Sequence, residues 1–130
     1  PYFPIPNQIP VKFTKNEDNR GAFVEIMRAG SAGQSSYSTT NPGITRGNHY
    51  HTRKVERFAV ISGKALIKIR KVNTDEIYEY ILDGNEPAYV DMPIWFTHNI
   101  TNIGDTELIT LFWINEPYNS DDSDTYFNEV

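Results

Sequence analysis

Three histidines and one glutamate are the side chains whose types and spacing most clearly suggest chemistry in this sequence. His49 and His51 stand two positions apart, Glu56 follows five positions later, and His98 is the third and last histidine. Because side chains at i and i+2 point to the same face of a β-strand, His49 and His51 can face one cavity. Glu56 can return to that face if the chain bends, and a later hairpin can bring His98. Three imidazoles and one carboxylate form a ligand set that borderline divalent metals favour.

Such a ligand set leaves coordination positions open to water or substrate. Open positions are typical of catalytic metal centres, whereas structural sites are usually closed. We therefore expect a divalent metal, with Zn²⁺ as the first choice. Fe²⁺, Mn²⁺ and Ni²⁺ use the same ligands and stay open as alternatives, as does a purely structural metal.

A second group of residues could bind a phosphorylated ligand. The stretch Asp-Asn-Arg-Gly-Ala-Phe-Val-Glu contains Arg20, Phe23 and Glu25. The planar guanidinium of arginine pairs with two phosphate oxygens at once, and an aromatic ring can stack on a nucleobase. Arg46, just before the first histidine, could be a second anion partner. The alternative is that Phe23 belongs to the core and that the arginines are solvated charges.

Length and composition exclude several classes of protein. The chain of 130 residues is long enough for one domain with a sizeable core. Its net charge of −5 argues against a nucleic-acid partner. The sequence has no apolar run of about 18 residues, no basic amphipathic stretch and no signal-like N-terminus, so we expect no membrane contact. The absence of cysteine fits a cytoplasmic protein.

Short β-prone runs separated by turn signals dominate the sequence, and no helical periodicity is sustained. We expect strands at residues 22–28, 34–40, 49–51, 57–62, 65–72, 77–82, 88–91, 96–102 and 108–115. Regular alternation of strands and turns over one domain predicts an all-β fold, a double-stranded β-helix or jelly-roll barrel. Residues 1–10 contain four prolines and should be extended, and Tyr126 and Phe127 should dock back on the barrel.

Both histidine motifs together resemble the signature of the cupin superfamily. The first, G-x5-H-x-H-x4-E-x6-G, matches in full from Gly43 onward. The second, P-x-W-x2-H-x3-N, places Trp95 where the superfamily has a glycine, and Gly84 stands further upstream than the pattern expects. The resemblance implies a cupin barrel that holds a metal through the three histidines and the glutamate.

Longer stretches are similar to the C-terminal cupin domain of the CapF family of capsular-polysaccharide enzymes and their O-antigen relatives. They include Pro-Gly-Ile-Thr-Arg-Gly-Asn-His-Tyr-His from Pro42 and Asn-Glu-Pro-Tyr from Asn115. The resemblance implies zinc and epimerisation at C3 of a UDP-4-keto-6-deoxy-N-acetylhexosamine, on the route to UDP-N-acetyl-L-fucosamine. A separate N-terminal domain of that family then reduces the keto group. One departure is Thr52, where the family often has a further histidine.

The stretch around Arg20 resembles the D-x-R-G-x-F-x-E element of cupin enzymes that act on nucleotide-linked keto-sugars. In those enzymes the arginine and the aromatic residue help to bind the nucleotide and its diphosphate, often across a dimer. The resemblance therefore implies that Arg20, Phe23 and Glu25 bind the substrate.

The segment around Arg46 resembles the R-G-x-H-Y element of dTDP-4-keto-6-deoxyglucose epimerases, where the histidine is the base and no metal is present. His49 is here a candidate ligand, so only Arg46 carries over, as a catalytic residue that holds phosphate or an oxyanion. The catalytic base stays open, with Tyr50, Lys54 and Lys68 as titratable candidates near the motifs.

We expect residues 1–130 to form a single cupin domain, which the start at Pro1 suggests is the C-terminal part of a longer bifunctional enzyme. The leading hypothesis is a metal-dependent nucleotide-sugar epimerase. The alternatives are a nucleotide-sugar 3,4-ketoisomerase, a metal-dependent dioxygenase and a non-catalytic sugar-binding module. The expected partners are a UDP-linked keto-sugar, a second copy in a homodimer and a covalently linked reductase domain.

Overall fold

The computed structural model describes residues 10–130, and its regular structure is almost entirely β-strand. The elements are β1 (Lys15–Asp18), β2 (Gly21–Arg28), the 3₁₀ turn η1 (Gly30–Ala32), β3 (Gln34–Thr40), β4 (Thr45–Tyr50), β5 (Glu56–Ser62), β6 (Lys64–Lys71), β7 (Ile77–Asp83), β8 (Ala88–Met92), β9 (Phe96–Asn102), β10 (Leu108–Ile114) and β11 (Tyr126–Phe127). Within these described residues, no helix is long and apolar enough to cross a lipid bilayer.

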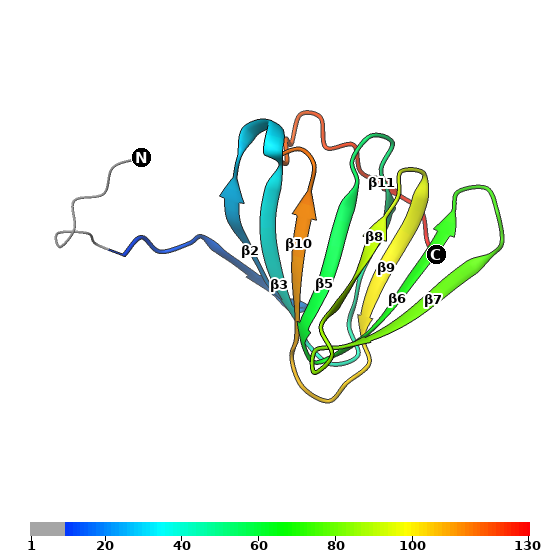
Figure 1. Cartoon of the computed structure of the whole chain (residues 1–130), viewed down its shortest axis with the longest axis horizontal. Coiled ribbons are helices and arrows are strands. Elements are labelled where there is room, and N and C mark those ends of the chain that lie inside the picture. Colours follow the sequence, from blue (N-terminus) through cyan, green and yellow to red (C-terminus); the bar gives the residue numbers. More distant parts are fainter. Residues whose placement is uncertain (1–9) are drawn as a thin grey trace.

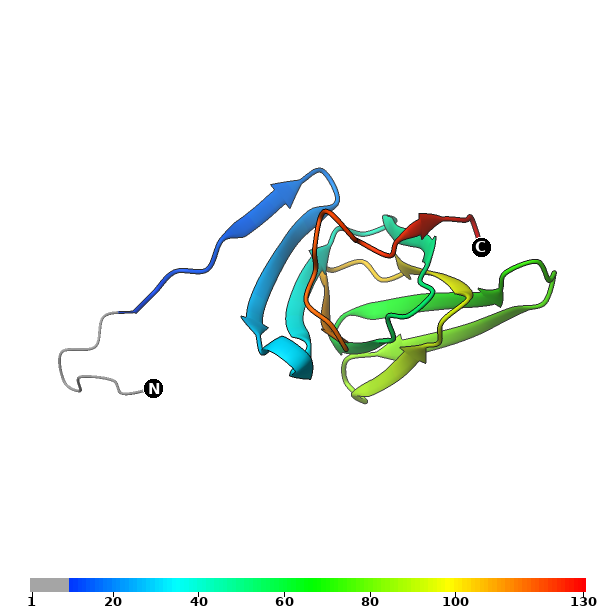
Figure 2. The ribbon, with the colours of Figure 1, turned by 90° about the horizontal axis from the view of Figure 1, so that it is seen from above.

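The strands form two antiparallel sheets that make the walls of a barrel (Figure 1). One sheet has the order β1-β2-β3-β10-β5-β8, and the other has the order β11-β4-β9-β6-β7. The C-terminal segment leaves β10 in the first sheet and reaches β11 in the second, so it passes from one wall to the other (Figure 2). Late strands lie between early ones in both sheets, as in a jelly roll, and the predicted fold class is therefore confirmed.

Side chains of alternating type explain how each sheet obtains a buried and an exposed face. In β6, Ala65, Ile67 and Ile69 are buried, whereas Lys64 and Lys68 point outward. This period of two is the one that a half-buried strand requires. The core formed in this way comprises Phe58, Val60, Ala65, Ile67, Ile69, Leu82, Met92, Ile100 and Leu108. Two of its members, Phe58 and Ile100, also line a pocket, so the core supports the site directly.

The observed strands differ from the prediction mainly in β1, β4 and β11. The predicted strand at residues 49–51 is only the end of β4, which begins at Thr45. Gly47 and Asn48 take positive φ angles of 103° and 61°, and the register with β9 shifts there. Such residues indicate a turn in sequence, but pairing with β9 keeps them in the sheet as a bulge. The tail docks as expected, because β11 pairs with β4.

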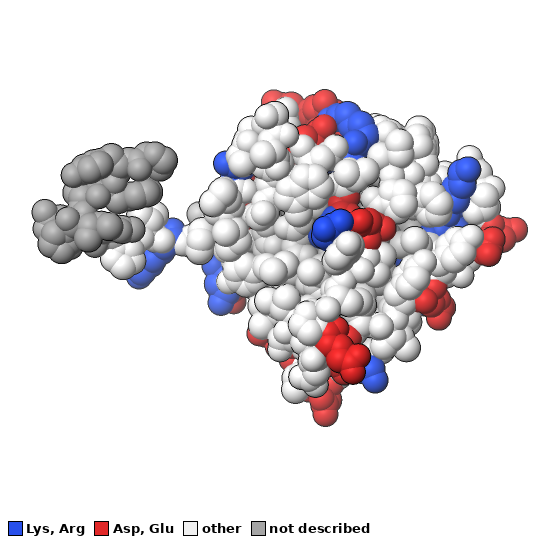
Figure 3. Space-filling model, in the orientation of Figure 1, with Lys and Arg blue, Asp and Glu red and all other residues white. Residues whose placement is uncertain are grey.

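The chain from residue 10 to β1 leads away from the barrel (Figure 2). Residues 1–9 lie outside the described residues, so the extended conformation predicted for 1–10 stays a prediction. Val11 and Phe13 are 90% and 57% exposed ahead of β1. On the face of the barrel seen in Figure 3, basic and acidic side chains are interspersed rather than gathered by sign.

Candidate metal centre and its pocket

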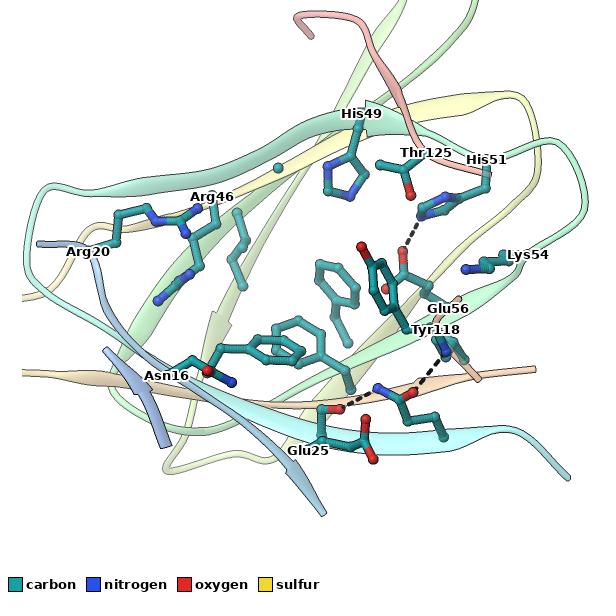
Figure 4. Close-up of a pocket in the computed structure, with 18 of the residues that line it drawn as sticks. Asn16, Arg20, Glu25, Arg46, His49, His51, Lys54, Glu56, Tyr118 and Thr125 are labelled. Atoms are coloured by element: carbon teal, nitrogen blue, oxygen red, sulfur yellow. Dashed lines mark hydrogen bonds and ion pairs between the residues drawn. The ribbon is translucent and has the colours of Figure 1, made fainter. Parts of the chain in front are cut away.

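The structure brings the three histidines and the glutamate together in one cluster. One ligand-type atom from each of His49, His51, Glu56 and His98 lies within 4.8 Å of the others. His49 on β4 stands opposite His98 on β9 in the sheet register, and Glu56 opens β5. His51 follows the end of β4, and its ring points toward Glu56 across the pocket (Figure 4).

Glycine and asparagine at the β4 bulge allow this convergence. A Cβ atom on Gly47 would lie 2.8 Å from the carbonyl oxygen of His98, so only glycine lets β4 approach β9 so closely. The bulge between Gly47 and His49 re-aims the following side chains, a common use of bulges beside active sites.

Burial and mutual contact shift the pKa values of the cluster. Burial would raise the pKa of Glu56, but the hydrogen bond from His51 and the nearby His98 outweigh burial and hold that pKa far below its ordinary value. Burial lowers the pKa of His49 to about 4, with a further lowering from His98. Burial would also lower the pKa of His51, but Glu56 and Asp124 raise it overall. At neutral pH the cluster therefore contains an ionised carboxylate and a neutral His49.

The donor atoms of this cluster fit a divalent metal. The Nδ1 atoms of His51 and His98 face backbone carbonyls, of Asp124 at 2.6 Å and of Phe96 at 3.2 Å. Metal-binding histidines usually fix their second nitrogen in this way. Nε2 of His98 is buried and has no hydrogen-bond partner among the described residues, because Glu56 Oε1 is 3.5 Å away. A buried, orphaned imidazole nitrogen beside a carboxylate is what a bound cation would satisfy.

Trp95 keeps the turn of the second motif although it replaces glycine. Its φ of 63° is the left-handed conformation that glycine would adopt. Its backbone N–H donates a hydrogen bond to the carbonyl of His51 at 2.8 Å. Its ring stacks on Tyr50 at a centroid distance of 5.6 Å, and Tyr50 stacks in turn on Tyr126 at 5.3 Å. Aromatic stacking therefore compensates for the backbone strain.

The pocket extends from the cluster to the predicted substrate-binding residues. It has a volume of about 580 Å³, which is within the range of ligand sites, and Arg20, Phe23, Glu25 and Arg46 all line it. Figure 4 shows Arg20 and Arg46 at one end and His51 with Lys54 at the other. The predicted substrate-binding residues therefore share one cavity, whose wall includes His49, His51 and Glu56 of the metal cluster.

Arg20 and Arg46, at one end of the pocket, already have partners. Arg20 contacts both carboxylate oxygens of Asp18, with Nη2 donating to Oδ2 at 2.7 Å and Nε to Oδ1 at 3.3 Å. Arg46 donates from Nε to Thr40 Oγ1 and from Nη2 to the carbonyl of Thr39, both at 3.0 Å. Among the described residues, no carboxylate pairs with Arg46. Burial, followed by the nearby Arg20, lowers its pKa, yet a guanidinium stays charged.

Phe23 and Glu25 face the pocket from β2. Phe23 is 38% exposed and stacks on Phe112 at 5.9 Å, so it is neither a core residue nor a free surface residue. Glu25 pairs with Arg28 at 2.9 Å. The first contact leaves a flat aromatic wall near the arginines. In the second, the charge of Glu25 at the pocket rim is balanced by Arg28.

Among the three candidate bases, only Lys54 lines the pocket. Tyr50 lies in the aromatic stack, and Lys68 faces Glu79 at 3.7 Å on the outside of the barrel. Lys54 is 3% exposed, and its Nζ donates to the carbonyl of Ser123 at 2.9 Å. Its ammonium also lies 5.6 Å from the ring centre of Tyr118.

The C-terminal segment supplies pocket residues that the sequence did not reveal. Tyr118 and Thr125 line the pocket, and Tyr118 reaches into it beside Glu56 (Figure 4). These residues belong to a turn-rich stretch without strand periodicity, so no local pattern marks them. Two signals in the sequence pointed to this segment: the Asn-Glu-Pro-Tyr stretch that ends at Tyr118 and the expected docking of Tyr126 and Phe127.

Comparisons with known proteins find a matching family and several relatives. The family model for the polysaccharide biosynthesis C-terminal domain matches residues 16–126 of this chain. The UDP-2-acetamido-2,6-beta-L-arabino-hexul-4-ose reductase of Pseudomonas aeruginosa is 40% identical over 111 residues, which are 85% of this chain and 30% of the reductase.

Solved structures extend these comparisons. The capsular polysaccharide assembling protein CapF from Staphylococcus aureus superposes with a TM-score of 0.91 at 45% identity, over 93% of this chain and 35% of CapF. One CapF structure contains the inhibitor 3-isopropenyl-tropolone. The CENP-C cupin domain of Drosophila melanogaster shares the fold alone. It superposes with a TM-score of 0.64 at 10% identity, over 78% of this chain and 74% of that domain's chain. The chain thus spans about a third of the length of the reductase and of CapF.

Proposed function

Because this chain belongs to the polysaccharide biosynthesis C-terminal domain family and has the CapF-type cupin fold, we propose that it is the epimerase domain of a nucleotide-sugar enzyme. The reaction would be metal-dependent epimerisation at C3 of a UDP-4-keto-6-deoxy-N-acetylhexosamine. The observation that carries the proposal is the convergence of three histidines and a glutamate beside a pocket that two arginines close at its other end.

The name of the Pseudomonas relative supports the substrate class. It describes a reductase of a UDP-linked acetamido sugar with a 4-keto group. The present chain matches only 30% of that protein, so reduction would reside in a separate N-terminal domain. We infer that such a domain is covalently linked to this one and that their joint product leads to UDP-N-acetyl-L-fucosamine.

The proposed chemistry follows from the weak acidity of a proton beside a ketone. A divalent ion, with zinc as the first choice, would supply Lewis acidity to the carbonyl oxygen when held by His49, His51, Glu56 and His98. Arg20 and Arg46 would hold the diphosphate and so orient the sugar toward the cluster. Phe23 would stack on the uracil, and Glu25 with its partner Arg28 would form the rim next to it.

Lys54 and Tyr118 are the residues that we assign to proton transfer. Both line the pocket next to the cluster, and no carboxylate lies within 4 Å of the Lys54 ammonium among the described residues. One of them, as neutral amine or phenolate, would accept the C3 proton, and the other, in its protonated form, would return a proton to the opposite face of the enolate. Lys54→Met preserves the length of the side chain and should suppress turnover without a comparable change in KM.

Exchange of the C3 proton with solvent tests the proposal. The zinc-loaded protein is incubated in D₂O with the UDP-linked 4-keto sugar, and the C3–H signal is followed by NMR. We expect the signal to disappear in the presence of zinc and to persist in the metal-stripped control. Persistence with zinc bound would refute catalysis and favour a sugar-binding module. Movement of the carbonyl would instead indicate a ketoisomerase, and oxygen consumption a dioxygenase.

An inhibitor of the solved relative offers a second test. Adjacent oxygens of a tropolone suit a divalent ion, and CapF has been solved with 3-isopropenyl-tropolone. We expect the metal-loaded chain to bind this compound in calorimetry and the metal-stripped chain to show no binding. Equal binding by both forms would contradict a role for the metal in recognition.

We also propose that the protein is a homodimer in which the N-terminal arm packs on the second copy. Val11 and Phe13 are exposed on this arm, and β1 contacts only β2 within its sheet. Burying these apolar side chains against a partner would favour association. Light scattering at micromolar concentration should give twice the monomer mass, and deletion of residues 1–14 should weaken the dimer. A monomer mass for the full chain would contradict the proposal.

A further inference from the structure

Asp124 occupies an unusual position in the C-terminal segment. It is 4% exposed and has a φ of 48°, a left-handed conformation that aspartate tolerates better than most residues. Its carboxylate accepts hydrogen bonds from three consecutive backbone N–H groups, of Thr52 at 3.0 Å, Arg53 at 2.9 Å and Lys54 at 3.1 Å. The hydroxyl of Thr52 donates a fourth at 2.6 Å. Asp124 therefore caps the loop between the ligands His51 and Glu56.

The backbone of the same residue contacts a ligand directly. The carbonyl oxygen of Asp124 lies 2.6 Å from Nδ1 of His51, although the two residues are 73 positions apart. With Nδ1–H donating to this carbonyl, Nε2 is the ring nitrogen available to a metal, and in the metal-free structure Nε2–H donates to Glu56 at 2.5 Å, a contact that a bound cation would replace. One residue thus fixes both the loop that carries His51 and the orientation of its ring.

Independent clamps hold the segment on both sides of Asp124. Before it, Arg53 pairs with Glu116 and Asp122, each at 2.9 Å. After it, β11 pairs with β4, and Arg70 donates to Asn128 Oδ1 at 2.6 Å. These clamps define the place of the segment without using the Asp124 carboxylate. The segment is therefore attached without the hydrogen bonds of Asp124. Its four carboxylate bonds and its carbonyl bond instead hold the loop that carries the ligands.

We propose that Asp124 is a positioning residue of the metal centre: its carboxylate locks the loop, and its carbonyl selects the tautomer of His51 that leaves Nε2 free. This inference rests on the proposed metal site and adds to it a contribution from the C-terminal segment. Outer partners of ligating histidines typically change metal affinity by about 10–100-fold. The same loss is expected here when the carboxylate no longer holds the carbonyl in place.

The test compares side-chain variants at a fixed backbone position. Asp124→Gly keeps the left-handed φ and removes the carboxylate, and Asp124→Asn retains one acceptor oxygen. Asp121→Asn, on the same segment, is the control, because its carboxylate makes no ion pair among the described residues. Zinc affinity is measured by competition with a chromophoric chelator, and the Nδ1–H proton of His51 is followed by NMR in the metal-free protein.

We expect Asp124→Gly to weaken zinc binding by about 10–100-fold and to expose the Nδ1–H proton to fast exchange. Asp124→Asn should lie between it and the wild type, and Asp121→Asn should match the wild type. A purely structural role would lower the melting temperature of the metal-free protein but leave both readouts unchanged, and that result would overturn the proposal. If the glycine variant does not fold, Asp124→Asn decides by the same readouts. The proton measurement needs no metal, so it separates failure of this inference from failure of the metal site.

Discussion

The two ends of the pocket are held by different physical means. At the cluster end, His51 and His98 are almost completely buried, and their ring nitrogens are fixed by backbone carbonyls. At the other end, Arg20 is half exposed and bound to an equally exposed Asp18. Arg46 lies between these extremes, since it is half-buried and bonded to β3.

This difference indicates which end of the pocket has its binding geometry in place before a ligand arrives. Buried groups that are held by backbone contacts keep their geometry without a ligand, which suits metal binding and catalysis. An exposed ion pair can exchange one anion for another at little cost, which suits a diphosphate that must enter and leave. We therefore expect losses of metal and turnover from changes at the cluster, and graded losses of affinity from changes at the arginines.

The largest effect should come from removing a ligand. His51→Ala deletes the imidazole that contacts Glu56, so elemental analysis should fall from about one zinc per chain to none. Solvent exchange at C3 should disappear with it. Lys68→Ala, on the outer face of β6, is the matched control and should retain both properties. Zinc content at the wild-type level in His51→Ala would contradict the ligand assignment.

The next effect concerns stability and pH in the metal-free protein. Burial lowers the pKa of His49 from 6.5 to about 4, so the unfolded chain binds a proton there that the folded chain does not. The free energy of unfolding should therefore fall as the pH is lowered through this window, by about 3 kcal/mol for this group.

Urea denaturation between pH 7 and pH 4 measures that fall, and His49→Gln should flatten it. The raised pKa of His51 acts in the opposite direction, because its contribution is lost as the pH rises. The depressed pKa of Glu56 adds to the loss only at lower pH. An unchanged slope in His49→Gln would mean that His49 is not buried in a neutral form.

A smaller effect is expected at Arg46. Arg46→Ala removes a charge-assisted contact worth about 1.5–3 kcal/mol, so KM should rise about tenfold or more while zinc content stays constant. Arg46→Lys retains the charge without the planar fork and should be intermediate. Steady-state kinetics of C3 exchange provides the measurement. A drop in kcat at constant KM would place Arg46 with the reacting atoms instead.

The smallest effect is expected at Arg20. Exposed ion pairs typically contribute about 0.2–1 kcal/mol, so Arg20→Ala should raise KM only about two- to fivefold. Asp18→Asn releases the guanidinium and should leave KM unchanged or lower it. The same kinetic assay compares the two variants. A larger loss in Arg20→Ala than in Arg46→Ala would reverse the proposed order of the pocket.

Most of the fold could be predicted because most of its strands show a local pattern of alternating buried and exposed residues. β6, for example, alternates buried aliphatic and outward charged residues, and Ser62-Gly63 marks the hairpin before it. β4 was shortened in the prediction because Gly47 and Asn48 look like a turn. In the structure they form a bulge that pairing with β9 stabilises.

The four cluster residues could be predicted because their spacing encodes a shared face, whereas their supports could not. Trp95 has the wrong residue type for a left-handed turn, and only its stacking on Tyr50 explains the choice. Asp124 acts through residues 70 to 73 positions away, at a distance that no local pattern reports. Residue types can be read from a sequence, but contacts between distant segments depend on the closed barrel.

The register that places His49 opposite His98 also has a kinetic consequence. These two residues lie far apart in the chain, so they meet only when β4 and β9 close a long loop. Non-local pairing of this kind slows folding, because the entropy of loop closure is lost before the contact forms. Refolding should therefore proceed at the same rate with and without zinc, whereas bound zinc should slow unfolding, because its ligands separate as β4 and β9 part.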